Sequence, residues 1–294
     1  MRREGATSRK GDRMITSGGT GGFDPVGTTR DAGSFEWDVD APILYALGVG
    51  AGTEELAFTT ENSSGIDQAV LPTFPVVMRS PGYKLHIGDH PLSSVLHGEQ
   101  FVELNSPLPT SGKVRITERV VSLFDKGKDA HTTVESELIS AQTGQRLATT
   151  RSTIVVRGAG GFGGERGDSA VWERPEREPD NKVSFLTRED LALLYRLSGD
   201  RNPLHSDPTV AAAAGFPVPI LHGLCTFGIA GRALLSSVCG NDVNRFKSMG
   251  GRFSRPVFPG QQLDTYIWFT PDGAVFQVRV GDVVVFDHGT MTTQ

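Results

Sequence analysis

The sequence is poor in cysteine and in long hydrophobic runs. It holds only two cysteines, Cys225 and Cys239, which are too few for a disulfide framework or a four-cysteine zinc site. No apolar stretch approaches the roughly 18 residues that a helix needs to cross a bilayer. We therefore expect no membrane partner, and we expect both thiols to be buried in a protein of a reducing compartment.

The sequence also lacks an excess of positive charge. Its net charge is −5, which argues against electrostatic attraction to nucleic acid or to an anionic membrane. The N-terminal residues have no apolar core of a secretory signal, and the C-terminal residues 291–294 do not form a peroxisomal tripeptide. These features predict a cytoplasmic protein.

An internal repeat is the main organising feature of the chain. A shift of 150 residues superposes residues 35–47 on residues 185–197 without a gap, and such self-similarity indicates a duplicated structural unit. The identical pairs are Phe35 and Phe185, Asp40 and Asp190, Leu44 and Leu194, Tyr45 and Tyr195, and Leu47 and Leu197. We therefore predict a flexible N-terminal arm (1–33), a first unit (34–157), a linker (158–181) and a second unit (182–294).

The predicted linker is rich in glycine and charge. Gly158, Gly160 and Gly163 match a dinucleotide-binding G-x-G-x-x-G pattern, but that pattern is meaningful only where it opens a helix after a strand. Residues 165–179 show no amphipathic helix, so a linker remains the preferred interpretation.

Each unit has helical patterns followed by strand patterns. In the second unit, a short helix capped by Thr187 ends near Gly199, and a helix with apolar residues nearly all round runs from Gly223 to about Leu235. Strand-like runs occupy residues 100–104, 113–124, 132–139, 146–156, 248–253, 263–269, 275–280 and 283–286. The pattern predicts an α+β fold in which a sheet wraps a helix.

A polar loop follows the first helix of the second unit. Asp200, Asn202 and His205 lie on it, and Pro203 stiffens it. A carboxylate and an imidazole at this spacing supply acid and base groups for proton-coupled chemistry. The spacing alone is also consistent with a purely structural role, in which Asp200 and Asn202 cap a turn and His205 is an ordinary surface histidine.

A second polar element begins the buried helix. His222 and Gly223 stand at its start, where backbone N–H groups lack helical partners and carry partial positive charge. The Gly223 N–H suits an oxygen that gains negative charge, although an ordinary helix start is an equal alternative. The first unit has Gly50, Pro72 and Thr73 at the positions of Asp200, His222 and Gly223, which favours one active and one degenerate unit.

Residues 195–208, with the sequence YRLSGDRNPLHSDP, resemble the signature of the MaoC-like (R)-specific enoyl-CoA hydratases. The resemblance extends over nearly the whole chain after the arm. It includes the segments LHGEQ at 96–100, DKG at 125–127, GGFGG at 160–164, ILHGLC at 220–225 and RFSRPVFPG at 252–260.

The resemblance implies a double hotdog fold, in which two antiparallel sheets each wrap a central helix. It implies a hydro-lyase that interconverts trans-2-enoyl-CoA and (3R)-3-hydroxyacyl-CoA. In this reading Asp200 and His205 activate water, Asn202 orients the loop, and the Gly223 N–H receives the thioester oxygen. The remaining implied contacts to the acyl-CoA come from His97, Gly98, Lys126, Arg201, Pro203, Leu204 and Phe253.

The resemblance also implies that no metal or other cofactor is needed, because CoA is part of the substrate. We expect a homodimer, and a first unit whose weak helix over residues 70–85 makes room for a long acyl chain. A dehydratase acting on acyl-carrier-protein thioesters and a non-catalytic acyl-CoA binding protein remain as alternatives.

Overall fold

The computed structural model describes residues 22–80, 90–91, 94–167 and 172–294. Most of the predicted flexible arm (1–33) therefore lies outside the described residues. Its end was wrongly assigned, because the first strand, β1, covers Thr29–Trp37 and hydrogen-bonds to a neighbouring strand from Thr29 onward.

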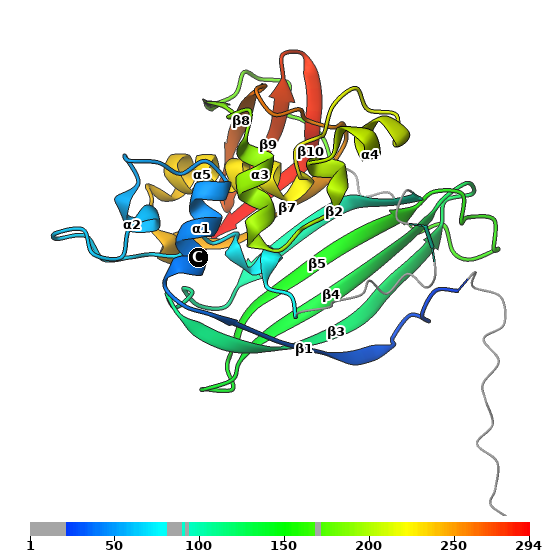
Figure 1. The fold of residues 1–294 in the computed structure, drawn as a ribbon, viewed down its shortest axis with the longest axis horizontal. Helices are drawn as coiled ribbons and strands as arrows, with labels where there is room; N and C mark the ends of the chain where they lie inside the picture. The colour runs from blue at the N-terminus through cyan, green and yellow to red at the C-terminus, as the bar shows by residue number, and fades with distance from the viewer. Residues whose placement is uncertain (1–21, 81–89, 92–93, 168–171) are drawn as a thin grey trace, which may run out of the picture.

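The described strands form one ten-stranded sheet with the order β1-β3-β4-β5-β2-β7-β10-β9-β8-β6 (Figure 1). Every described strand pair is antiparallel. The further strands are β2 (Val95–Leu104), β3 (Gly112–Asp125), β4 (Ala130–Ser140), β5 (Arg146–Val156), β6 (Asn181–Leu186), β7 (Phe246–Phe253), β8 (Gln262–Thr270), β9 (Gly273–Val280) and β10 (Val283–Thr293). All eight strands predicted from the sequence are present.

The strand order repeats, which explains the sequence repeat. The first five strands occur as β1-β3-β4-β5-β2, and the last five occur in the same pattern as β6-β8-β9-β10-β7. The two halves join where β2 pairs with β7, with Glu99 opposite Arg252 and Glu103 opposite Ser248. The double hotdog prediction is confirmed, with the two sheets fused edge to edge.

The second half contains the long central helix. Helix α5 covers Gly223–Cys239, ends at Gly240 with a left-handed φ of 65°, and buries most of its side chains against the concave side of the sheet. It runs four residues beyond the predicted end. The shorter helix α3 covers Leu191–Tyr195, but the Thr187 hydroxyl donates to the Gln261 carbonyl instead of capping it.

The first half has no such helix in the part of the chain that is described. The segment equivalent to the start of α5 forms only a four-residue 3₁₀ turn, η1 (Phe74–Val77), which contains Pro75. Proline removes a backbone donor and disfavours a continuous helix. The prediction of a weak helix holds for residues 70–80, whereas 81–85 lie outside the described residues. The other helices of this half are α1 (Asp40–Gly48) and α2 (Leu56–Thr59).

The first part of the predicted linker is folded and not free. The segment from Gly158 to Gly163 donates hydrogen bonds to the hairpin between β3 and β4, and Asn181, its last residue, opens β6. Among the described helices, none is long and apolar enough to cross a membrane.

Candidate active site

Polar side chains of the loop after α3 hydrogen-bond to the backbone of that loop. The chain leaves the helix through a 3₁₀ turn, Arg196–Ser198, and reverses at Gly199, whose φ is 128°. The Asp200 carboxylate then accepts the Asn202 N–H at 3.1 Å. The Asn202 side chain accepts the Leu204 N–H at 3.0 Å and caps the turn Pro203–His205. Asn202 therefore acts on the backbone of the loop.

Two histidine rings stack behind this loop. The ring centroids of His205 and His222 are 3.7 Å apart, at an interplanar angle of 27°. His205 Nδ1 lies 2.9 Å from the Ile220 carbonyl, and His222 Nε2 lies 3.2 Å from the Asp200 carbonyl. A carbonyl only accepts, so each of these ring nitrogens carries the proton. The lone pair of His205 is consequently on Nε2.

The polar atoms of this loop and of the two histidines are close enough to share one water molecule. A carboxylate oxygen of Asp200 and one ring nitrogen each of His205 and His222 all lie within 4.8 Å of one another. A water that makes two hydrogen bonds of ordinary length at its tetrahedral angle spans about 4.4 Å. A carboxylate and an imidazole at this separation can therefore share a single water.

Burial keeps the imidazoles of this site neutral. His205 is 9 % exposed and His222 is 1 % exposed. Desolvation lowers the pKa of both rings, while the nearby Asp200 carboxylate opposes the shift. The neighbouring ring is a further cause that lowers the pKa of His222. A neutral imidazole with a free lone pair is the form that can accept a proton.

The Gly223 backbone directly follows His222 at the start of α5. A Cβ at this position would lie 3.1 Å from the Phe253 ring, so only glycine leaves the backbone accessible here without displacing Phe253. As the first residue of the helix, Gly223 has an N–H with no intrahelical acceptor. This N–H is available to an oxygen of a bound ligand.

The first half contributes to the site through β2. The His97 ring lies 5.0 Å from the Phe253 ring in an edge-on contact. Burial lowers the pKa of His97 to about 4, and both Arg79 and Asp200 act on it electrostatically. Gly98 sits at a bulge of β2, where a Cβ would be 2.8 Å from Val155. The structure thus brings His97 and Phe253 together with the Asp200 loop.

Lys126 lies apart from this group. It follows the end of β3, and its ammonium is 5.3 Å from the centre of the Phe124 ring. The Arg201 side chain is exposed on the loop, and Leu204 is half-buried. Within the described residues, the side chains of Lys126 and Arg201 make no hydrogen bond or ion pair to Asp200 or His205.

The sequence alone did not place His222, Tyr195 and Tyr45 next to the polar loop. His222 was identified only as a residue at the helix start, yet its ring stacks on His205 and also contacts the tilted Tyr195 ring, whose centroid is 4.9 Å away. Tyr195 and Tyr45 are fully buried and 6.2 Å apart, and desolvation raises the pKa of each hydroxyl. The coincidence of Tyr45 and Tyr195 in the repeat was the available signal.

In the first half, the Phe185 ring occupies the space next to Gly50, the position equivalent to Asp200. A Cβ at Gly50, the counterpart of Asp200, would overlap the Phe185 ring at 2.1 Å. Thr73, the counterpart of Gly223, is 2 % exposed, and its methyl group lies against Gly231 of α5. No side chain larger than hydrogen fits at residue 50, so this half cannot repeat the polar loop.

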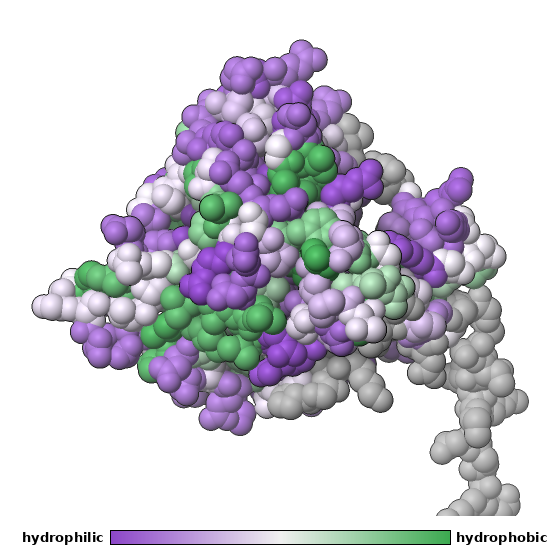
Figure 2. Space-filling model, turned by 45° about the horizontal axis from the view of Figure 1, so that its top comes forward, coloured by the Kyte–Doolittle hydropathy of each residue, from purple (hydrophilic) through white to green (hydrophobic). Residues whose placement is uncertain are grey.

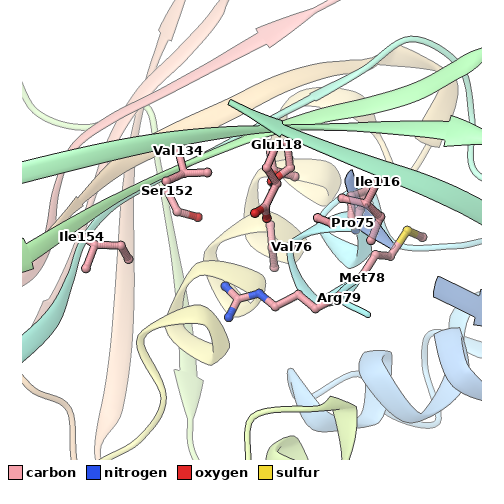
Figure 3. Close-up of a pocket in the computed structure, with 12 residues that line it drawn as sticks. Pro75, Val76, Met78, Arg79, Ile116, Glu118, Val134, Ser152 and Ile154 are labelled. Carbon is pink, nitrogen blue, oxygen red and sulfur yellow. The ribbon is translucent and has the colours of Figure 1, made fainter. Parts of the chain in front are cut away.

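A pocket opens instead on the concave side of the first half (Figure 3). Figure 3 shows Glu118 pointing into it from β3 and Arg79 entering from the opposite side. The rest is lined both by apolar side chains, including Ile116, Val134 and Ile154, and by the hydroxyl side chains of Ser136, Thr150 and Ser152. Arg79 also acts on the pKa values of His97 and Tyr195, so the pocket adjoins the histidine site.

The group of Asp200, His205 and His222 could also offer ligands to a metal ion. Stacked rings direct their in-plane lone pairs along parallel planes, which is a poor arrangement for two ligands of one ion. The donor set therefore fits proton transfer better than metal binding.

Comparison with known proteins agrees with this geometry. A model described as MaoC like domain matches residues 170–287, and one described as MFE-2 hydratase 2 N-terminal domain matches residues 35–158. The 3-hydroxyacyl-thioester dehydratase Y of Mycobacterium tuberculosis is 48 % identical over 278 residues, which cover 90 % of this chain and 96 % of that protein. The chain belongs to the MaoC-like dehydratase family.

Further relatives of this MaoC-like dehydratase support the assignment. The peroxisomal enoyl-CoA hydratase 2 of Arabidopsis thaliana is 36 % identical over 81 % of this chain and 83 % of its own. The crystal structure of a MaoC-like dehydratase from Phytophthora capsici superposes with a TM-score of 0.82 and 32 % identity, covering 91 % of this chain and 95 % of that one. The predicted family, fold and enzyme class are confirmed.

Proposed function

We propose that this MaoC-like protein is an (R)-specific enoyl-CoA hydratase that interconverts trans-2-enoyl-CoA and (3R)-3-hydroxyacyl-CoA. The observation that carries the proposal is that polar atoms of Asp200 and His205 lie within 4.8 Å of each other, close to the first backbone N–H of α5 at Gly223, which follows His222 of the same group. His205, Asp200 and the Gly223 N–H supply a base, a second hydrogen-bond acceptor for water and a donor for the thioester oxygen.

In the hydration direction, His205 Nε2 accepts one proton of the water while the water oxygen bonds to Cβ of the substrate. The π electrons of the double bond shift to the thioester oxygen, and the Gly223 N–H stabilises the resulting enolate. The imidazolium of His205 then returns the proton to Cα. The Asp200 carboxylate orients the water and stabilises the transient imidazolium. Dehydration is the same sequence in reverse.

We assign the remaining contacts to substrate binding. Phe253 lies beside the Gly223 backbone, His97 contacts the Phe253 ring, and Gly98 follows His97 on β2, so these residues suit the thioester end. Lys126 lies farther along the sheet and suits the carrier. The loop residues Arg201, Pro203 and Leu204 shape the access to Asp200 and His205, with Asn202 as the residue that orders them.

The pocket of the first half suits the acyl group. Its apolar side chains, including Ile116, Val134 and Ile154, can contact an alkyl chain. The Glu118 carboxylate, which accepts a hydrogen bond from Arg30 at 2.9 Å, makes part of its wall polar together with Arg79 and the hydroxyl groups of Ser136 and Ser152. We propose that an acyl chain of more than four carbons extends from the active site toward this pocket. Turnover of four-carbon substrates alone would contradict this assignment.

The test of the function is an assay with two substrates. Purified protein is incubated with crotonyl-CoA and with a medium-chain 2-enoyl-CoA, and the loss of enoyl absorbance is followed. A stereospecific dehydrogenase then determines the configuration of the 3-hydroxyacyl product. We expect the (R) product from both, whereas an (S) product or no hydration would overturn the proposal.

The same assay, extended to an enoyl thioester of an acyl carrier protein, distinguishes two alternatives. A dehydratase of acyl-carrier-protein thioesters would prefer the protein-bound substrate by kcat/KM over the CoA substrate. A non-catalytic acyl-CoA binding protein would bind the substrate without loss of absorbance, but the presence of both Asp200 and His205 in reach of one water disfavours that reading.

We further propose a cytoplasmic homodimer that needs no metal or other cofactor for turnover. Exposed apolar side chains on the helical segments, including Leu47, Leu193 and Leu197, could be covered in a dimer, and Figure 2 shows hydrophobic surface gathered in patches on the face that it views. Light scattering after size exclusion tests the dimer, and full activity in the presence of a chelator tests the absence of a metal.

A further inference from the structure

A single buried carboxylate ties two distant parts of the first half together. Asp125 ends β3 and is only 6 % exposed. Its Oδ1 accepts the N–H groups of Gly127 and Gly161, both at 2.8 Å, and its Oδ2 accepts the Gly163 N–H at 2.8 Å. Gly161 and Gly163 come 36 and 38 residues after Asp125, so this carboxylate fastens the glycine-rich segment to the hairpin.

Other contacts show that the glycine-rich segment is fitted to the hairpin. The Gly160 N–H donates to the Lys128 carbonyl at 3.1 Å, and a Cβ at Gly160 would lie 2.6 Å from the Gly127 carbonyl oxygen. The Gly158 N–H donates to the Asp129 carboxylate at 2.9 Å. Phe162 packs on a small core that contains Phe23, Ala130 and Val156. These contacts hold the glycine-rich segment in a defined position against the hairpin.

Three cationic side chains surround this segment, whereas the carboxylates of Asp125 and Asp129 accept its backbone N–H groups. Lys126 follows Asp125 directly, Lys128 stands at the hairpin tip, and Arg157 precedes the glycines. Next to the glycine-rich segment lies an open pocket of about 490 Å³, lined by residues 157–162 and by His90, Pro91 and Ser94. Lysine and arginine side chains around exposed glycine backbone suit phosphate groups. In Figure 1 the tip of the β3–β4 hairpin lies at the right of the molecule, the side on which α4 (Pro208–Ala213) also lies.

We propose that Asp125 is a positioning residue for the carrier part of the thioester, because it holds Gly161 and Gly163 against the hairpin and thereby fixes the cationic rim for the phosphate groups of CoA. The proposal rests on the proposed hydratase function. Asp125 does not touch the reacting atoms, and its effect passes through Lys126, Lys128 and Arg157.

The charge of Asp125 matters for this arrangement. The N–H donors of Gly161, Gly127 and Gly163 stabilise the ionised form and lower the pKa of the carboxyl group. In Asp125→Asn one acceptor oxygen becomes an NH₂ group, which cannot accept from the N–H that now faces it. The variant keeps the size of the side chain and loosens the glycine-rich segment on at least one side.

The experiment compares CoA thioesters with truncated thioesters. Wild type, Asp125→Asn and Asp242→Asn are assayed with crotonyl-CoA and with crotonyl-pantetheine, which lacks the nucleotide and its phosphates. Asp242 is the matched control, since its carboxylate also accepts a backbone N–H, that of Asn244 at 2.9 Å, in a turn of the other half.

For Asp125→Asn we expect KM for crotonyl-CoA to rise about tenfold with kcat within about twofold, and kcat/KM for crotonyl-pantetheine to stay within about twofold. The control should change neither. An equal loss on both substrates would mean a merely structural role and would overturn the proposal, as would unchanged KM for the CoA substrate. Asp125→Glu, which keeps the charge, should recover part of the loss.

Two further measurements cover the cases in which Asp125→Asn does not fold or the wild type is inactive. If Asp125→Asn does not fold, the double variant K128M/R157M leaves the carboxylate in place and should show the same rise in KM for crotonyl-CoA alone. If the wild type hydrates neither substrate, the proposed function fails, and calorimetric titration with CoA itself decides the positioning role: a Kd unchanged in Asp125→Asn would reject it.

Discussion

Asp200 and His205 divide the requirements of water addition between an exposed carboxylate and a buried imidazole. The carboxylate sits at the mouth of the loop, and the ring is fixed by its bond to the Ile220 carbonyl. Because the proton on Nδ1 is held by this bond, Nε2 is left to accept a proton. The protonation state that the reaction needs is therefore set by the backbone and by burial.

Removal of either group should abolish most of the activity without unfolding the protein. For Asp200→Asn and His205→Gln we expect kcat to fall by about 10²–10⁴-fold, the usual contribution of a positioned acid or base. The rate of loss of enoyl absorbance measures the effect, and circular dichroism checks the fold.

Asp207→Asn is the control from the same loop. Asp207 caps α4 by accepting the Thr209 N–H at 2.8 Å, and asparagine is an equally good N-cap, so both the free energy of unfolding and turnover should stay near the wild-type values. Near-full activity in either Asp200→Asn or His205→Gln would show that the residue has another role.

Single residues were predictable where the motif names them and unpredictable where the fold brings them together. The spacing of Asp200 and His205 in one loop pointed to acid and base chemistry. The stacking of His222 on His205 could not be read from the chain, because it depends on how α5 begins behind the loop. The reason for Gly50 was also hidden, since the Phe185 ring that excludes a side chain comes from the other half.

At the scale of elements, the strands with alternating apolar residues were predictable and the two edge strands were not. β1 and β6 lie at the ends of the sheet, where one side has no strand partner among the described residues. In both strands exposed residues alternate with residues that are only half-buried, and Trp37 alone is fully buried, so the contrast between their two faces is weaker than in an inner strand. Their positions follow from the repeat once one of them is known.

Two glycines of helix α5 allow residues of the first half to pack closely against its backbone. A Cβ at Gly228 would lie 2.4 Å from Val49, and a Cβ at Gly231 would lie 2.5 Å from Thr73. Both distances are below van der Waals contact, so these glycines allow the first half to approach the helix backbone. They lie in the interior of a helix, where glycine itself is unfavourable.

Gly231→Ala should therefore destabilise the protein, although alanine favours a helix by about 1 kcal/mol over glycine. Overpacking in a well-packed core typically costs about 1–3 kcal/mol, so we expect a net loss of about 1 kcal/mol in the free energy of unfolding. Urea denaturation measures it. Ser236→Ala, at an exposed position of α5, should be neutral or slightly stabilising, and a Gly231→Ala protein as stable as wild type would refute the packing argument.

At the scale of the whole molecule, the site depends on the seam between the halves. His97 comes from β2, and Phe253 comes from β7, the strand with which β2 pairs. The Asp200 loop and α5 come from the second half, whereas the pocket with Glu118 and Arg79 belongs to the first. The duplication was visible in the sequence, but the division of labour between the halves required the three-dimensional packing.

This seam should make the protein sensitive to mild acid. Burial lowers the pKa values of His97, His205 and His222 from the ordinary 6.5, to about 4 for His97. Between these values the unfolded chain binds protons that the folded protein does not, so the free energy of unfolding falls as the pH falls through 6.5 toward 4. Each such histidine contributes up to about 1.4 kcal/mol per pH unit.

Urea unfolding at pH 7.5, 6.5 and 5.5 measures this loss while the carboxylates are still mostly ionised. We expect the midpoint to be constant near pH 7.5 and to decrease below pH 6.5. His97→Gln removes one of the three rings that resist protonation, so the midpoint of that variant should fall less steeply between pH 6.5 and 5.5. A wild-type midpoint that is the same at all three pH values would contradict the burial of neutral histidines at the seam.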